Sequence, residues 1–169
     1  MEQSGYKAGV LTMSDKCSRG ERVDESGALA VRMLEDDGFE VVQKKIVPDR
    51  AEDIISTIKE WCDIKKLSLI VTSGGSGLSP TDITPQAMLE VIDFEVPGMA
   101  EAMRAESLKK TPHAMLSRAM AGVRGRTLII NLPGSPKGVK ENLAVVLPAL
   151  KHAISKLRGD ESDCATPLK

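Results

Sequence analysis

Residues 67–85 read LSLIVTSGGSGLSPTDITP, and this segment is the clearest indication of the fold class. Its first part, residues 67–72, is short, apolar and bounded by turn signals, which is typical of a strand buried on both faces. Thr84 offers an N-cap hydroxyl and Pro85 suits the first helical position, so a helix is predicted to begin just after Asp82. A buried strand, a loop and a helix in this order indicate an α/β domain.

The loop between that strand and that helix has a composition suited to phosphate. Gly74, Gly75 and Gly77 allow the backbone to approach a ligand and to turn its N–H groups inward. Asp82 can hold a cation that neutralises phosphate charge. Glycine, serine and aspartate also build ordinary loops, so that interpretation stays open. The loop has neither the Lys-Ser/Thr of a Walker A motif nor the Gly-x-Gly-x-x-Gly dinucleotide pattern.

The rest of the chain continues the alternation of strands and helices. Further strands are predicted over residues 7–14, 40–47 and 127–131. Helices are predicted over residues 26–37, 52–61 and 97–120, the last with an interruption near Thr111-Pro112. A final helix is predicted from about residue 136 onward, with a bend or break near Pro148. This order predicts a three-layer α/β/α sandwich with a mostly parallel sheet. We expect residues 1–158 to form one domain and residues 159–169 a polar, flexible tail.

Polar loops follow each predicted strand. They are Ser14-Asp15, Pro48-Asp49, residues 73–82 and residues 132–136. Because the carboxyl ends of parallel strands lie along one edge, these loops are expected to share a cleft. Each has a plainer interpretation: Asp49 with Glu52 can cap a helix, Asp15 can end a strand, and Pro133-Gly134 can form a tight turn.

Composition excludes several classes of protein. The formal net charge of −1 and the aromatic content of 2% disfavour a nucleic-acid partner. Cys17, Cys62 and Cys164 have no Cys-x-x-Cys spacing and favour a reducing compartment. His113 and His152 have no zinc-ligand spacing. No signal peptide or membrane span is recognised, so we expect a cytoplasmic protein without a membrane partner.

Seven motifs, in order along the chain, match one known family. They are GVLTMSD (9–15), VPD (47–49), TSGGSG (72–77), DITP (82–85), PGM (97–99), AMLSR (114–118) and NLPGSP (131–136). With these motifs the chain resembles the MogA and MoaB proteins of molybdenum cofactor biosynthesis, which include the G domain of gephyrin. The resemblance covers nearly the whole chain.

The resemblance implies a molybdopterin-binding domain of α/β/α fold, usually a homotrimer. Active members transfer AMP from Mg-ATP to molybdopterin, release pyrophosphate and pass adenylyl-molybdopterin to a separate MoeA-like molybdenum-insertion protein. By resemblance, Asp49 and Asp82 are the catalytic carboxylates and the ligands of Mg²⁺.

The resemblance also assigns the binding residues. The substrate and nucleotide contacts would be Ser14, Asp15, Ser73, Gly74, Gly75, Ser76, Gly77, Pro133, Gly134 and Ser135. Thr81 stands where many relatives carry Arg, so positive charge would come from elsewhere, such as Arg50, Arg118 or Lys137. Two alternatives stay open: a non-catalytic molybdopterin carrier of the MoaB type, and a nucleotide-hydrolysing relative of the CinA type.

Overall fold

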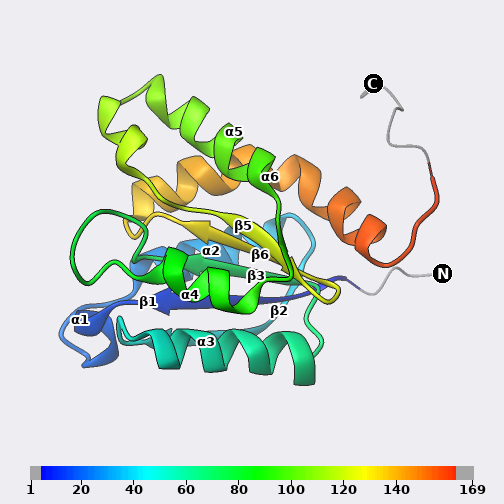
Figure 1. Ribbon diagram of the computed structural model, residues 1–169, viewed down its shortest axis with the longest axis horizontal. Helices are drawn as coiled ribbons and strands as arrows, with labels where there is room; N and C mark the ends of the chain where they lie inside the picture. The colour runs from blue at the N-terminus through cyan, green and yellow to red at the C-terminus, as the bar shows by residue number, and fades with distance from the viewer. Residues whose placement is uncertain (1–4, 163–169) are drawn as a thin grey trace.

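The computed structural model describes residues 5–162, which form a sheet between two layers of helices (Figure 1). The strands are β1 (Lys7–Met13), β2 (Glu40–Val47), β3 (Leu69–Ser73), β4 (Phe94–Glu95), β5 (Ala121–Arg124) and β6 (Thr127–Leu132). Their order is β2-β1-β3-β6-β5-β4, and β2, β1, β3 and β6 run parallel, whereas β5 and β4 are antiparallel to their neighbours. The predicted three-layer, mostly parallel α/β fold is confirmed.

Helices cover both faces of this sheet (Figure 1). The helices are α1 (Asp15–Ser18), α2 (Glu25–Asp36), α3 (Ala51–Lys59), α4 (Thr84–Val91), α5 (Pro97–Leu108) and α6 (Pro136–Leu157), with a π-helical turn (Glu60–Ile64) after α3 and a 3₁₀ helix (Pro112–Leu116) after α5. In Figure 1, α3 and α4 lie below the sheet, and α5 and α6 lie above it. No helix within residues 5–162 combines the length and the apolarity that crossing a bilayer requires.

Two apolar cores hold the layers together. Successive strand residues point to opposite faces, so Val10, Val71 and Ile130 pack toward α2, α5 and α6, while Leu11, Ile70 and Ile129 pack toward α3 and α4. Each fully buried side chain of this kind contributes roughly 1.5–3 kcal/mol relative to its exposed state. The central strands are therefore the most firmly fixed part of the scaffold that carries the loops.

Several local predictions were wrong. The interval between residues 14 and 26 contains α1, which was expected to be loop, and residues 117–120 are not helical although a helix was predicted as far as residue 120. The strands β4 and β5 were missed because they are short. The last helix is not broken at Pro148. Pro148 is exposed, so its ring leaves the buried face of α6 uninterrupted.

Both predicted helix caps were also wrong. Thr84 Oγ1 donates to the carbonyl oxygen of Gly74 at 2.9 Å, and Ile83 stands at the N-cap of α4 without a side-chain hydrogen bond. Arg50 stands at the N-cap of α3 and likewise makes no side-chain cap bond, and Oδ2 of Asp49 accepts from the N–H of Asp15. Thr84 and Asp49 thus form hydrogen bonds with residues distant in sequence and do not cap the helices that follow them.

The expected tail begins inside the described residues and continues beyond them. Gly159, with φ of +94°, follows α6, and the chain has no regular structure over 160–162. The remainder of the predicted tail, with Cys164, lies outside the described residues. Cys17 and Cys62 are free and buried.

Candidate active site

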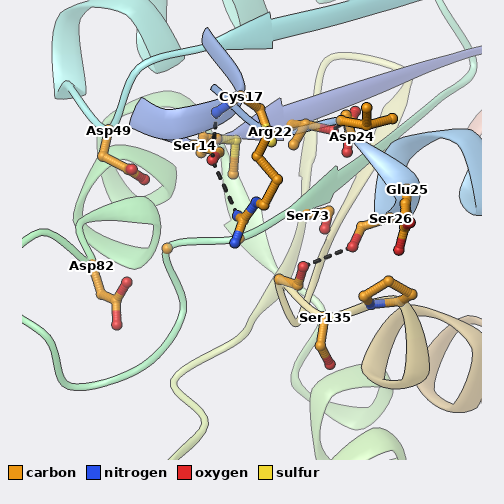
Figure 2. A pocket seen from close by; sticks show the side chains of 17 residues that line it. Ser14, Cys17, Arg22, Asp24, Glu25, Ser26, Asp49, Ser73, Asp82 and Ser135 are labelled. Carbon is orange, nitrogen blue, oxygen red and sulfur yellow. Dashed lines mark hydrogen bonds between the residues drawn. The ribbon is translucent and has the colours of Figure 1, made fainter. Parts of the chain in front are cut away.

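The main cleft lies at the carboxyl ends of β1, β3 and β6, and these strands run toward the left in Figure 1. Its volume is about 710 Å³. Its lining residues are Thr12, Met13, Ser14, Cys17, Arg22, Val23, Asp24, Glu25, Ser26, Asp49, Ser73, Gly74, Gly75, Asp82, Gly134, Ser135 and Pro136. The topology has therefore gathered most of the predicted site residues into one space (Figure 2).

Asp15 and Asp49 form a reciprocal pair at the ends of β1 and β2. The backbone N–H of Asp15 donates to Oδ2 of Asp49 at 3.0 Å, and the N–H of Asp49 donates to Oδ1 of Asp15 at 3.0 Å. Asp49 lines the main cleft, whereas Asp15 does not. Asp15 therefore orients Asp49 from behind, and the other oxygen of Asp49 accepts no hydrogen bond from the described residues.

Asp82 lies on the same side of the cleft as Asp49 (Figure 2). Its Oδ2 accepts from the N–H of Ser79 at 3.1 Å, and its backbone carbonyl accepts from Nη2 of Arg118 at 2.7 Å. Nε of Arg118 also donates to the carbonyl of Gly77 at 2.8 Å. The side chain of Arg118 therefore holds the backbone of residues 73–82, which we call the glycine loop. The loop thus holds one carboxylate oxygen of Asp82 and leaves the other available.

Electrostatics favours a cation beside these carboxylates. Burial raises the pKa of Asp49, and the nearby negative charges of Asp15 and Asp82 raise it further. Within residues 5–162, no cluster of three or more His, Cys, Asp or Glu side chains could hold a metal without help. Two carboxylates suit Mg²⁺, which usually completes its coordination with water and substrate phosphate oxygens. The donor chemistry of these two carboxylates therefore fits Mg²⁺.

The glycine loop requires glycine at positions 74 and 75. Gly74 has φ of +102°, and a Cβ there would lie 2.4 Å from the carbonyl oxygen of Met13. Gly75 has φ of +66°, and its Cβ would lie 2.4 Å from Oγ1 of Thr84. Side chains would be strained and crowded at both positions. The bare backbone of Gly74 and Gly75 consequently lines the cleft.

A facing wall is formed by residues 133–135. Oγ of Ser73 donates to the carbonyl of Pro133 at 3.0 Å, and Oγ of Ser26 donates to the carbonyl of Gly134 at 2.7 Å. Ser135 caps α6 by accepting from the N–H of Gly138 at 3.0 Å. The wall is thus tied to β3 and to α2, and its residues Gly134 and Ser135 line the main cleft.

All of the remaining predicted residues except Asp15, which lines neither cleft, line a second, smaller cleft of about 340 Å³. Ser76, Gly77 and Pro133 lie there and not in the main cleft. The two clefts share Gly75, Asp82 and Gly134. The predicted binding residues therefore separate into two adjoining spaces that meet at Asp82.

Arg22 is one of the cleft residues that the sequence reasoning missed. Among the described residues lining the main cleft it is the only Lys or Arg, against four carboxylates. Its Nη2 donates to Oγ of Ser14 at 3.4 Å, and its side chain reaches across the cleft (Figure 2). No ion pair of Arg22 is found with the described residues. A search for cations in the polar loop after the first strand would have found it.

The three cations suggested from the sequence lie elsewhere. Arg50 pairs with Asp53 at 2.7 Å and is exposed, Arg118 braces the glycine loop, and Lys137 lines a groove beside α6. Asp24 was also missed: it caps α2 by accepting from the N–H of Gly27 at 2.8 Å.

Comparison with known proteins finds relatives over most of the chain. Residues 9–152 match the family described as the probable molybdopterin binding domain. The chain is 44% identical to gephyrin of Dictyostelium discoideum, over 90% of this chain but only 23% of that protein. It is 39% identical to the molybdopterin adenylyltransferase of Helicobacter pylori strain J99, over 90% of this chain and 88% of that protein.

A solved structure shows the same fold. The chain superposes on the molybdopterin biosynthesis enzyme MoaB of Thermus thermophilus with a TM-score of 0.87 and 51% identity, over 92% of this chain and 98% of that one. The motifs, the fold and these likenesses agree, and the chain belongs to the family of the probable molybdopterin binding domain.

Proposed function

We propose that the protein acts in molybdenum cofactor biosynthesis as a molybdopterin adenylyltransferase, which transfers AMP from Mg-ATP to molybdopterin. The terminal phosphate oxygen of molybdopterin would attack the α-phosphorus of ATP. The bond between the α-phosphorus and the bridging oxygen would break, and pyrophosphate would leave. The Helicobacter relative, which the chain matches over most of both lengths, is named molybdopterin adenylyltransferase, and this likeness supports the reaction.

One observation carries the proposal. The main cleft joins a bare glycine backbone to four carboxylates and a single arginine. Without a metal ion such a cleft repels phosphate, so it suits a substrate that arrives with a divalent cation. Mg-ATP is such a substrate, and the glycine N–H groups can donate hydrogen bonds to its phosphate oxygens.

The chain's own residues would divide the work. Asp49 and Asp82 would hold Mg²⁺, which would neutralise phosphate charge and orient the phosphates. Asp15 would fix the direction of Asp49, and Arg22 would contact phosphate from the side of Ser14. A phosphate monoester is already ionised near neutral pH, so no general base is required.

The two clefts offer a meeting point for two substrates. They share Gly75, Asp82 and Gly134, so a group bound in one cleft lies next to a group bound in the other. We place Ser14 and Asp15 on the nucleotide side. Ser73, Ser76 and the neighbouring glycines would cradle phosphate or pterin, with Pro133, Gly134 and Ser135 opposite.

The proposal extends to assembly and context. We infer a homotrimer in the cytoplasm that hands adenylyl-molybdopterin to a MoeA-like insertion protein, as the family resemblance implies. The exposed apolar side chains Met115 and Leu116, which are 67% and 49% exposed, are compatible with a covered surface in such an assembly.

The test is pyrophosphate release and formation of adenylyl-molybdopterin from molybdopterin and Mg-ATP. Asp82→Asn keeps the shape of the side chain and removes its charge, so kcat is expected to fall by about 10²–10³-fold, as when one electrostatic contact to a transition state is lost. Asp37→Asn, at the end of α2 and paired with Lys151, is the matched control and should keep full activity.

The outcomes separate the candidate functions. Unchanged turnover in Asp82→Asn would remove the metal-holding role. Molybdopterin binding without pyrophosphate release would favour the non-catalytic carrier. Nucleotide consumption without molybdopterin would favour a hydrolase.

A further inference from the structure

A second large cavity lies at the opposite edge of the sheet. Its volume is about 610 Å³, and it is formed where β3 and β6 begin, beside the β5–β6 turn and the end of α6. Its lining residues are Cys62, Asp63, Lys66, Leu67, Ser68, Gly125, Arg126, Thr127 and Arg158. We call it the amino-edge cavity. It shares no lining residue with the main cleft.

The charges of the amino-edge cavity are mostly positive. Lys66, Arg126 and Arg158 line it, and none of the three forms an ion pair with the described residues. Its one carboxylate, Asp63, is held by Arg124 through two contacts of 2.9 and 2.7 Å. Three cations around one cavity, without a free carboxylate, leave a strong attraction for an anion.

Arg158 is held in place by uncharged groups. Its Nη2 donates to Oγ of Ser68 at 2.6 Å, and its guanidinium lies 4.6 Å from the ring centroid of Tyr6. These contacts order the side chain without neutralising it. An ordered cation with unused N–H donors is suited to bidentate contact with a phosphate or carboxylate group.

The backbone beside the cavity also has an unusual conformation. Lys66 has φ of +53°, and it is the only non-glycine residue with positive φ among the described residues. A side chain in this conformation costs free energy unless the surroundings fix it. The conformation places Lys66 in the connector that leads directly into β3, next to Leu67 and Ser68 of the cavity lining.

The remaining lining is neutral. Burial raises the pKa of the Cys62 thiol to about 11, so this group is uncharged at neutral pH. The hydroxyl of Thr127 donates to the carbonyl of Leu67 at 2.6 Å. Asp93, which lies nearby, accepts from the N–H of Gly125 at 2.7 Å and does not line the cavity. Within the described part of the chain, the paired Asp63 is the only lining group that opposes an anion at neutral pH.

We propose that the amino-edge cavity is a binding site for a small phosphorylated anion, contacted by Lys66, Arg126 and Arg158. More than one cation favours a ligand with several negative charges, such as a diphosphate or a phosphorylated metabolite. Among residues 5–162 the lining contains no aromatic side chain on which a base could stack, so a nucleotide base is not the recognised part. This site is separate from the proposed transferase reaction and stands whether or not that reaction occurs.

The test uses inorganic pyrophosphate and amide NMR with no divalent metal present. Under EDTA the carboxylate-rich main cleft should repel pyrophosphate, while the amino-edge cavity should bind it. Amides of Ser68, Gly125 and Thr127 should shift and saturate with an apparent Kd below about 1 mM at low ionic strength. The chemical shifts of the amides of residues 74–77 should not change.

Variants assign the contacts. Lys66→Gly suits the positive φ, and Arg126→Gln changes an exposed side chain, so the double variant should fold. It should weaken binding by about tenfold or more, as expected when two charge-assisted contacts are lost. Lys65→Ala removes one neighbouring charge, which pairs with Glu60 outside the cavity, and should change affinity less than about twofold.

Three results would overturn the proposal. They are shifts that rise linearly without saturating up to about 10 mM pyrophosphate, shifts confined to residues 74–77, and equal weakening by Lys65→Ala and by the double variant. The last result would indicate a general charge effect without a built site.

Discussion

The two edges of the sheet carry cavities of similar size and opposite charge. The main cleft, of about 710 Å³, has four carboxylates and one arginine, whereas the amino-edge cavity, of about 610 Å³, has three cations and one paired carboxylate. Both face the ends of the same central strands. The volume of a cavity alone therefore does not indicate its ligand. The main cleft needs a metal ion before it can accept phosphate, whereas the amino-edge cavity does not.

The largest contrast should come from matched glycine substitutions at the two edges. A Cβ at Gly74 would lie 2.4 Å from a backbone oxygen, whereas a Cβ at Gly125, with φ of +57°, would have nothing within 4 Å. Gly74→Ala should cost about 3–5 kcal/mol of unfolding free energy through strain and crowding. It should also lower kcat/KM about 10²-fold by displacing the loop.

Gly125→Ala is the matched control for that change. It should cost only about 1 kcal/mol, the left-handed penalty for a side chain without a clash. Urea unfolding and the transferase assay measure both quantities. Equal losses of stability would show that the glycine loop is not specially crowded.

Carboxylate substitutions should give the next largest contrast. Asp49→Asn can still accept the N–H of Asp15 but loses its charge, so kcat/KM should fall about 100-fold. Asp63→Asn lies outside the main cleft and should leave kcat/KM unchanged. A loss of activity in Asp63→Asn comparable to that in Asp49→Asn would contradict the assignment of chemistry to one edge.

The same two variants should have opposite effects on stability as pH changes. Burial raises the pKa of Asp49 in the folded protein. The favourable contribution of this carboxyl group to folding stability is therefore complete below its pKa in the unfolded chain, and it is lost as pH rises through its pKa in the folded protein. Arg124 lowers the pKa of Asp63, so its contribution is present above the unfolded pKa and is lost as pH falls through the folded pKa.

Unfolding near pH 7 and near pH 3 should separate the two cases. Near pH 7, Asp49→Asn should be at least as stable as the parent, and Asp63→Asn less stable by at most about 1 kcal/mol because its ion pair is solvent-screened. Both differences should shrink near about pH 3. Destabilisation by Asp49→Asn at neutral pH alone would show that its charge is satisfied by the protein.

The smallest contrast should come from the two arginines. Arg22→Gln removes the lone cation of the main cleft and should lower kcat/KM for Mg-ATP about tenfold, mainly through KM, because a phosphate contact is lost. Arg126→Gln, in the amino-edge cavity, should change it less than about twofold. Equal decreases in kcat/KM for the two variants would mean that the decrease is caused by the loss of long-range charge and not by the loss of a contact between Arg22 and phosphate.

The scaffold was predictable because its central strands carry clear apolar patterns. Residues 67–72 and 127–131 contain the apolar runs 69–71 and 128–130, and the observed β3 and β6 begin and end within two residues of the predicted bounds. The two-residue β4 is exposed and has no such pattern. Its pairing depends on β5, which a local reading of the sequence does not reveal.

The meeting of Asp49 and Asp82 followed from parallel-strand geometry, but their hydrogen bonds did not. Local rules assign Asp49 and Thr84 to helix caps, yet Asp49 bonds Asp15 across 34 positions and Thr84 bonds Gly74. Arg22 was missed because the polar segment after the first strand also carries Lys16 and Arg19, and the sequence does not show which of these side chains points into the cleft. The catalytic and binding roles themselves stay predictions.

The strand order has a consequence for synthesis on the ribosome. β3 and β6 are neighbours at the centre of the sheet, but the whole segment between Ser73 and Thr127 is made before β6 begins. At bacterial and eukaryotic elongation rates this takes roughly 3–10 s. During that time the nascent chain has one edge of β3 without its final partner, and neither the facing wall nor the main cleft exists until residues 133–135 have emerged.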